Sequence, residues 1–210
     1  MVKFFMVSYR YLFNGITTVI NTLYIRYIQC IQGGVNIGTN LRLCGRMKFR
    51  LARGSTFNIG NDSVITGGFF TNTLGCLRGS CISVDRNAIL EIGCNTGMSD
   101  VSIRVEVCVI IGDNVTIGAE TIISDSNAHS LNYLNRRLER QHGDKSDISR
   151  APVIIEDDVF IGARCIIGKG ITIGARSIIA AGSVVKDDIP PDEIWGGNPA
   201  RFIKKIVYEE

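Results

Sequence analysis

Aliphatic residues recur along the second half of the chain at a fixed spacing of six. A period of six fits neither an α-helix, which repeats every 3.6 residues, nor a simple strand, which repeats every two. It is typical of a parallel β-helix, in which each short strand contributes one inward aliphatic and three strands complete one coil. The repeated positions are Ile155, Ile161, Ile167, Ile173, Ile179 and Val185. Small residues follow at the corners, where the chain must turn tightly: Gly162, Gly168, Gly174 and Ala180.

The same phase runs upstream, so we predict a β-helix over residues 32–189. Its earlier aliphatic positions are Val105, Ile111, Ile117 and Ile123, and the pairs Ile37-Gly38, Ile59-Gly60 and Ile92-Gly93 mark less regular repeats.

Residues 46–51 alternate with a period of two, which predicts a strand with one face in the core. The basic residues Arg46, Lys48 and Arg50 would face outward, and Met47, Phe49 and Leu51 inward. Such a basic ridge is either a solvated face or a docking surface for an anionic glycan or a lipid phosphate.

Residues 124–152 break the period. They are polar and charged, and they hold both histidines of the chain, His129 and His142. We therefore predict an excursion from the β-helix, and long excursions from regular scaffolds tend to carry function.

Residues 1–31 differ from the rest because they contain seven of the 16 aromatic residues. We predict one or two helices here. They either cap the open end of the β-helix or lie on an anionic membrane surface, and the two roles are compatible. Residues 1–61 carry eight basic residues and no acidic one, which indicates an anionic partner for this end of the chain. We expect no cleavable signal and no simple membrane span.

The C-terminal extension, residues 190–210, follows the end of the β-helix near Pro190-Pro191. Asn198 as N-cap and Pro199 at the first helical position predict a short helix there.

Several kinds of site are excluded by residue counts and spacings. Seven cysteines, none in a Cys-x-x-Cys pair, favour small buried side chains in a reducing cytoplasm over disulfides or a metal cluster. Two histidines are too few for the three-histidine zinc site of β-helical carbonic anhydrases, so we predict no metal. We find no Ser-His-Asp arrangement, phosphate-binding glycine loop or dinucleotide motif, and no nucleic-acid module.

Two stretches resemble a known family: Ile123-Ser-Asp-Ser-Asn-Ala-His129-Ser-Leu, and Asp158-Val-Phe-Ile-Gly-Ala163 through to Gly196-Gly-Asn-Pro-Ala-Arg-Phe-Ile-Lys-Lys205. They resemble the hexapeptide-repeat acyltransferases, within which they are most similar to maltose/galactoside acetyltransferases and to the sugar O-acetyltransferases of capsule and O-antigen synthesis. The resemblance covers residues 92–206. It implies a left-handed coil, a homotrimer, acetyl-CoA as co-substrate, and a sugar or oligosaccharide acceptor, free or lipid-linked. A cytoplasmic protein, working at the inner face of the membrane, is the expected setting.

Transfer of an acetyl group to a hydroxyl requires a base, and histidine suits this role near neutral pH. We predict that His129, where the chain leaves the last regular strand, is that base. Asp125 or Asn127 would orient either the imidazole or the loop. By resemblance, Asn95 would contact the acceptor, although a corner asparagine is an equal alternative. Phe160 would lie beside the acceptor or simply line the groove.

The resemblance also implies positions for acetyl-CoA between two subunits. The Ala163 N–H would bind the developing oxyanion, and the Ala181-Gly182 turn would admit the pantetheine arm. Arg201 and Lys204 would meet the phosphates. Lys186 stands one position before a lysine common in relatives and would substitute for it.

Two alternatives to a sugar O-acetyltransferase remain at this point. One is an acetyltransferase for another small acceptor, such as an antibiotic, serine or an amino sugar. The other is a non-catalytic β-solenoid that serves as a scaffold or binding module.

Overall fold

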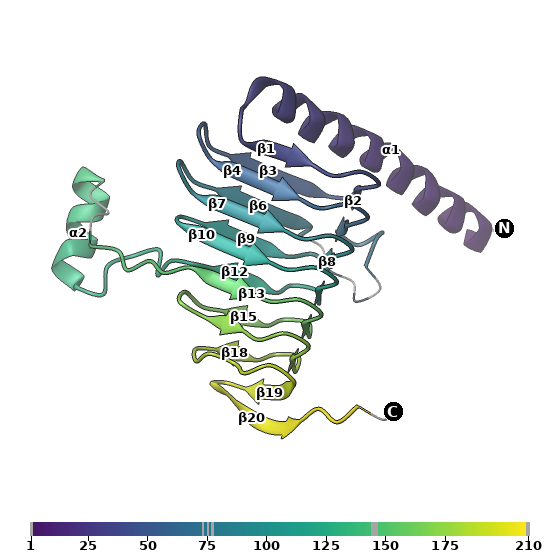
Figure 1. Ribbon diagram of the computed structural model, residues 1–210. Coiled ribbons are helices and arrows are strands. Elements are labelled where there is room, and N and C mark those ends of the chain that lie inside the picture. Colours follow the sequence, from purple (N-terminus) through teal and green to yellow (C-terminus); the bar gives the residue numbers. More distant parts are fainter. Residues whose placement is uncertain (1, 73, 75, 77, 144–146, 209–210) are drawn as a thin grey trace.

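The chain folds into a three-sided parallel β-helix with a long helix across its first coil (Figure 1). The computed structural model describes residues 2–208 except 73, 75, 77 and 144–146, and it describes no side chain of residues 2–11, 140 or 142. The helices are α1 (Val2–Ile31) and α2 (Tyr133–His142).

Each side of the β-helix is one sheet, which we call sheets A, B and C. Sheet A contains β1 (Val35–Ile37), β4 (Thr56–Ile59), β7 (Ile89–Ile92), β10 (Cys108–Ile111), β13 (Val153–Ile155) and β16 (Thr172–Ile173). Sheet B contains β2 (Arg42–Gly45), β5 (Val64–Gly67), β8 (Gly97–Ser99), β11 (Thr116–Ile117), β14 (Phe160–Ile161), β17 (Ile178–Ile179), β19 (Glu193–Gly197) and β20 (Ala200–Lys205). Sheet C contains β3 (Met47–Leu51), β6 (Ser80–Val84), β9 (Ser102–Val105), β12 (Ile122–Ser124), β15 (Ile166–Ile167) and β18 (Val184–Val185).

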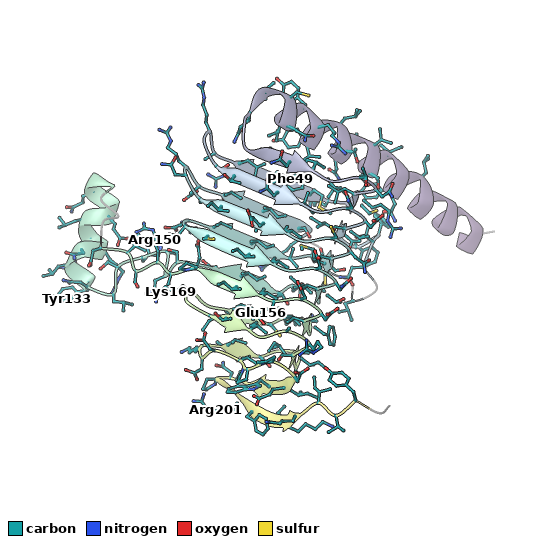
Figure 2. The ribbon with its side chains drawn as sticks, in the orientation of Figure 1. Phe49, Tyr133, Arg150, Glu156, Lys169 and Arg201 are labelled. Carbon is teal, nitrogen blue, oxygen red and sulfur yellow. The ribbon has the colours of Figure 1, made fainter. Side chains whose placement is uncertain are left out.

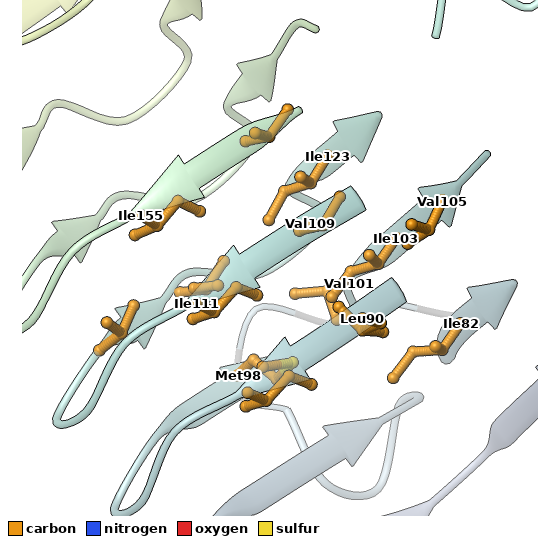
Figure 3. Close-up of a cluster of buried hydrophobic side chains, with 14 of the residues drawn as sticks. Ile82, Leu90, Met98, Val101, Ile103, Val105, Val109, Ile111, Ile123 and Ile155 are labelled. Atoms are coloured by element: carbon orange, nitrogen blue, oxygen red, sulfur yellow. The ribbon is translucent and has the colours of Figure 1, made fainter. Parts of the chain in front are cut away.

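The six-residue period places its aliphatic side chains inside the β-helix, as predicted. Ile155 pairs with Ile173, and Ile167 pairs with Val185 one coil further on. All six repeated positions are at most 1% exposed. The same stacking continues upstream through Ile111, Ile123 and their neighbours (Figure 3). Because each inward side chain contacts the one above it, the core is a continuous column.

The basic strand of residues 46–51 also behaves as predicted. In β3, Phe49 is buried while Lys48 and Arg50 are exposed.

Helix α1 covers the open end of the first coil through a largely polar face. Asn21 Nδ2 donates to the carbonyl oxygens of Leu43 (3.0 Å) and Gly45 (2.9 Å), and Thr17 Oγ1 accepts from Gly45 N–H (3.0 Å). Ile25 and Ile28 add the buried apolar contact. These bonds satisfy edge groups of β2 that have no strand above them.

The predicted C-terminal helix is wrong. Residues from Ala200 form β20, which pairs antiparallel with β19 around a turn that holds the cis Asn198-Pro199 peptide. The edge of sheet B offers unpaired backbone groups to this segment, and that long-range pairing outweighs a local capping signal. Trp195 of β19 packs edge-on against Phe202 of β20, with ring centroids 6.4 Å apart.

Two excursions leave the coils. The excursion predicted over residues 124–152 occupies residues 125–152, because Ser124 still belongs to β12, and it contains α2, which the sequence did not lead us to expect. A second excursion, residues 68–79 between β5 and β6, was not predicted. Asp100, 3% exposed, ties its ends by accepting from the N–H groups of Gly68 (2.6 Å) and Gly79 (3.0 Å).

Among the described helices, none combines the length and the apolar character that a membrane crossing needs. The described residues also contain no group of three or more potential metal ligands.

Candidate functional site

The excursion that carries His129 begins beside a shortened corner of the β-helix. Val84 pairs with Val105, and Leu90 pairs with Val109. The first corner therefore spans six positions (84 to 90) and the second only four (105 to 109). Because two residues are missing, the backbone around Glu106 cannot repeat the turn of the coil before it.

Asp125 fills this shortened corner. Its Oδ1 accepts from Glu106 N–H (2.8 Å), and its Oδ2 accepts from the N–H groups of Val107 (2.6 Å) and Cys108 (2.8 Å). The Asp125 carbonyl also accepts from Ala151 N–H (3.0 Å), so this fully buried residue joins the start of the excursion to its end. Of the two roles predicted for Asp125, orientation of the loop fits and orientation of the imidazole does not.

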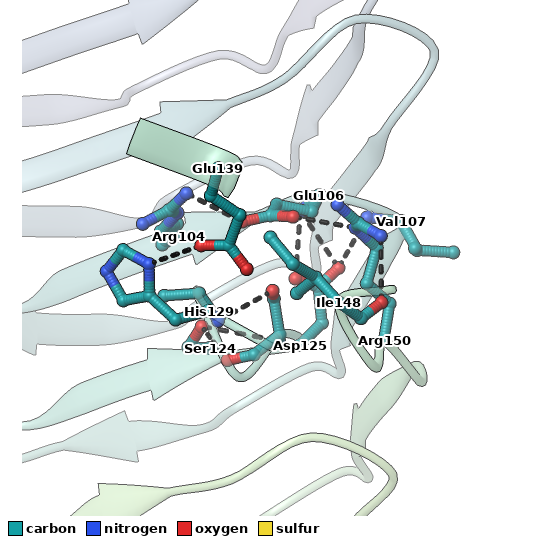
Figure 4. Close-up of polar contacts among 11 residues, drawn as sticks. Arg104, Glu106, Val107, Ser124, Asp125, His129, Glu139, Ile148 and Arg150 are labelled. Carbon is teal, nitrogen blue, oxygen red and sulfur yellow. Dashed lines mark hydrogen bonds and ion pairs between the residues drawn. The ribbon is translucent and has the colours of Figure 1, made fainter. Parts of the chain in front are cut away.

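A second buried acid holds the other end of the excursion. Glu106 Oε2 accepts from Arg150 Nε (2.7 Å), and Glu106 Oε1 forms an ion pair with Arg104 Nη2 (2.6 Å). Burial raises the pKa of Glu106, but the bond from Arg150 and the charge of Arg104 outweigh it, so the pKa lies below the usual glutamate value. The excursion is thus fixed to the corner after β9 by two carboxylates (Figure 4).

Helix α2 supplies the direct partner of His129. Glu139 Oε2 lies 3.0 Å from His129 Nδ1, and Glu139 Oε1 accepts from Ser130 N–H (2.7 Å). The Glu139 side chain is only 8% exposed, whereas that of His129 is 73% exposed. Asn132 caps the start of α2 by accepting from Leu134 N–H (3.0 Å), which sets the helix where Glu139 reaches the histidine.

This pairing decides which imidazole nitrogen is available for chemistry. A carboxylate only accepts hydrogen bonds, so in the neutral imidazole Nδ1 carries the proton and Nε2 has the free lone pair. The bonds from His129 and from Ser130 N–H lower the pKa of Glu139, which keeps this acceptor ionised near neutral pH. His129 therefore presents a basic nitrogen on an exposed ring whose tautomer is fixed.

Sequence reasoning missed Glu139, and the other predicted partner contributes little. Asn127 is exposed, and its recorded bond is from its backbone N–H to the Ser149 carbonyl (3.1 Å). The Asn132 N-cap and the left-handed Gly143 that ends α2 were the available signal for a helix bearing Glu139. The side chain of His142 lies outside the described residues.

Two hollows adjoin the His129 segment. One of about 280 Å³ is lined by His129, Tyr133, Arg136 and Arg137. The other, of about 500 Å³, runs over the outer face of sheet C to Ser124, the last residue before the excursion. Its polar lining is Lys48, Arg50, Arg104, Ser83, Ser102 and Ser124, with Asp85 as the acidic member.

The residues predicted to hold acetyl-CoA lie at another corner. Ala163 follows β14, at the corner between sheets B and C, and no hydrogen bond from its N–H is recorded among the described residues. Gly118 must be glycine beside it, because a Cβ there would lie 2.4 Å from Ala163 N. Ala181 and Gly182 occupy the same corner one coil later; Gly182 has φ 75° and open space around it.

The remaining predicted residues are exposed. Phe160 is 45% exposed on sheet B. Arg201, near the opposite end of the β-helix from Phe49 (Figure 2), pairs with Asp187 at 2.9 Å, and Lys186 and Lys204 lie on the surface.

Asn95 has the conformation and contacts of a corner asparagine, and its predicted contact with an acceptor stays a prediction. It has φ 53°, and its Nδ2 donates to Asn114 Oδ1 of the next coil (2.8 Å). Such a ladder stabilises stacked corners.

Within one chain the predicted base and the predicted oxyanion donor are separate. His129 follows sheet C toward sheet A, whereas Ala163 lies between sheets B and C. The predicted base therefore lies beyond the C-terminal ends of the strands of sheet C, and the predicted oxyanion donor lies before their N-terminal ends.

Comparison with known proteins agrees with these features. Residues 108–124 and 152–186 match the family model described as a hexapeptide repeat of succinyl-transferase. Galactoside O-acetyltransferase of Escherichia coli is 36% identical over 98 residues, which are 47% of this chain and 44% of that protein. Mitochondrial gamma carbonic anhydrase 2 of Arabidopsis thaliana is 35% identical over 114 residues, 49% of this chain and 41% of that protein. The chain thus spans less than half the length of these curated relatives.

Among solved structures, a hexapeptide-repeat acetyltransferase from Vibrio cholerae in complex with acetyl-CoA aligns with a TM-score of 0.54 and 28% identity. The alignment covers 87% of this chain and 76% of that one. The resemblance to hexapeptide-repeat acetyltransferases is therefore confirmed, and with it the left-handed parallel β-helix.

Proposed function

We propose that this hexapeptide-repeat protein transfers the acetyl group of acetyl-CoA to a sugar hydroxyl, with His129 as general base. The observation that carries the proposal is the His129–Glu139 pair, in which the Glu139 carboxylate engages Nδ1 and leaves Nε2 of an exposed ring without a protein partner among the described residues. The similarity to acetyltransferases supplies the reaction class.

In the proposed reaction, His129 Nε2 takes the proton of the acceptor hydroxyl as its oxygen bonds to the acetyl carbonyl carbon. The Ala163 N–H donates to the carbonyl oxygen as that oxygen gains charge. When the carbon–sulfur bond breaks, His129 returns the proton to the leaving thiolate. The protein forms no covalent bond to the acetyl group, and Glu139 holds the imidazole throughout.

A second copy of the chain would complete the site. Because His129 and Ala163 lie at opposite ends of sheet C, a homotrimer could bring the histidine of one subunit to the Ala163 corner of the next. Ala181 and Gly182 would then line the path of the pantetheine arm. Arg201, Lys186 and Lys204 would meet the phosphates, with Asp187 giving up Arg201 to them.

The hollow on sheet C favours an acceptor that carries a negative charge. Lys48 and Arg50 make no ion pair with a described side chain, and both line this hollow beside the residues that precede His129. The hydroxyl groups of Ser83, Ser102 and Ser124 suit sugar hydroxyls. An acidic sugar or a lipid-linked oligosaccharide of capsule or O-antigen synthesis fits this lining.

The test is release of free thiol from acetyl-CoA by the full chain, with neutral and acidic sugars as acceptors. We expect acceptor-dependent release that falls about 10²- to 10⁴-fold in His129→Ala. His142→Ala is the matched control and should retain activity. Thiol release that occurs only with an antibiotic, serine or an amino sugar would show that the acceptor belongs to that class and is not a sugar hydroxyl. Acceptor-dependent release that is unchanged in His129→Ala would remove the proposed base, and failure to bind acetyl-CoA would favour a scaffold.

A further inference from the structure

Helix α1 is oriented with its polar face toward the protein. The inward positions Asn14, Thr17 and Asn21 are half-buried and bond to backbone groups of the first coil or of residues 68–79. Among the described side chains of α1, only Ile25 and Ile28 are buried apolar residues. A helix that simply covered a core would show the opposite arrangement, with apolar residues inward and polar residues outward.

The outward face of the described part of α1 is a continuous apolar stripe. Its members recur at spacings of three and four, so they line one side of the helix. They are 47–65% exposed: Leu12, Ile16, Val19, Ile20, Leu23, Tyr24, Tyr27 and Ile31. A contiguous apolar surface of this kind marks a site that another apolar surface covers.

Exposed arginines lie at the same end of the β-helix as this stripe. Arg26 lies exposed on α1, Arg42 is exposed at the start of β2, and Arg53 is exposed at the turn after β3. Arg26 is anchored to the carbonyls of Ile37 and Gly38 (3.0 Å each), so its charge stays at this end. The first 61 residues contain no acidic residue that would offset these charges.

We propose that α1 docks the protein onto an anionic lipid surface, with its apolar stripe in the headgroup region and the long axis of the β-helix directed away from the bilayer. Leu and Ile side chains enter the acyl boundary, while Tyr24 and Tyr27 place their hydroxyls among the headgroups. The arginines at this end of the β-helix add electrostatic attraction to the anionic headgroups.

A second copy of the chain is the rival occupant of this face. Its pairing through α1 would bring together two N-terminal segments, each with eight basic and no acidic residues in its first 61 positions, and their repulsion opposes that contact. An anionic membrane satisfies the apolar stripe and the positive charge at the same time. This inference goes beyond the proposed acetyl transfer and does not depend on it.

The experiment is flotation of the full chain with vesicles of phosphatidylcholine alone or of phosphatidylcholine and phosphatidylglycerol. We expect binding to the mixed vesicles, weakened by salt, and little binding to the neutral ones. Leu23→Glu, at a position 65% exposed, should weaken binding at least about 10-fold. Val207→Glu, at a position 84% exposed near the other end, is the matched control and should bind as the wild type does. Arg42→Gln and Arg53→Gln should each weaken binding about 5-fold.

Size-exclusion chromatography with light scattering distinguishes the rival. If Leu23→Glu changes the oligomeric state and the wild type does not float with either vesicle, the stripe belongs to a second copy. Equal binding of the wild type and Leu23→Glu to anionic vesicles would also overturn the proposal. Because no acetyl transfer is measured, either result leaves the proposed reaction untouched.

Discussion

Asp125 lies four residues before the candidate base His129, but its hydrogen bonds indicate a structural role. Removal of its carboxylate should therefore destabilise the protein. Asp125→Ala leaves three N–H groups, those of Glu106, Val107 and Cys108, without their acceptor. These groups are part-buried, so we take the lower end of the cost of an unsatisfied donor, about 1 kcal/mol each, or about 3 kcal/mol together. For a chain of this size, that loss lowers Tm by roughly 6–12 °C.

The assay is thermal unfolding of the full chain, followed by circular dichroism. Asp85→Ala is the matched control, because Asp85 begins the equivalent corner one coil earlier and its side chain is exposed. We expect this control to stay within about 0.5 kcal/mol of the wild type. An Asp125→Ala protein with the same Tm as the wild type would refute the structural role of this carboxylate. If Asp125→Asn melts normally but has lost transferase activity, Asp125 orients the imidazole after all.

Three further predictions concern the excursions. Glu139→Gln places an N–H donor opposite His129 Nδ1, which favours the tautomer protonated at Nε2; activity should fall about 10- to 100-fold at neutral pH with unchanged Tm, and an unaltered pH–rate profile would contradict this role. Because the pKa of Glu106 is lowered in the folded state, its contribution to folding stability is complete above the unfolded-state pKa of about 4.3. That contribution is lost as the pH falls through the lower folded-state pKa. Limited proteolysis should therefore cut residues 125–152 only at acidic pH, and Glu106→Gln should allow cutting at neutral pH as well. Asp100→Ala should expose residues 68–79 to protease at neutral pH, whereas Asp62→Ala, at an exposed corner position, should not.

The regular part of the fold could be predicted from the sequence because its cause is local and repeated. Ile155, Ile161 and the positions after them all meet the same requirement, one inward aliphatic for each strand. His129 was recognisable for a related reason, since it stands where that period stops. The predicted C-terminal helix failed because Ala200 and the residues after it respond to the free edge of sheet B, which no local pattern reveals.

The partners of the site were harder to predict because they depend on missing or distant residues. Asp125 binds its donors because two residues are missing from a corner 17 to 19 positions earlier in the chain. Glu139 meets His129 only after α2 folds back over the excursion. Its spacing of ten residues from the histidine matches no repeat.

The number of stacked coils sets how far the candidate base lies from the first coil. Sheet C climbs from β3 through β6 and β9 to β12, which is three steps, and parallel neighbours lie about 4.8 Å apart, so the strand before His129 stands roughly 14 Å above the first coil. With α1 lying on the bilayer, its diameter adds about 10 Å. A lipid-anchored acceptor would have to present its hydroxyl roughly 25 Å from the membrane, a reach of several sugar units. Insertion of one complete coil before β9 would raise that distance by about 5 Å and leave the chemistry of His129 unaltered, so under the proposed membrane contact the number of coils would select which sugar of a lipid-anchored acceptor can be modified.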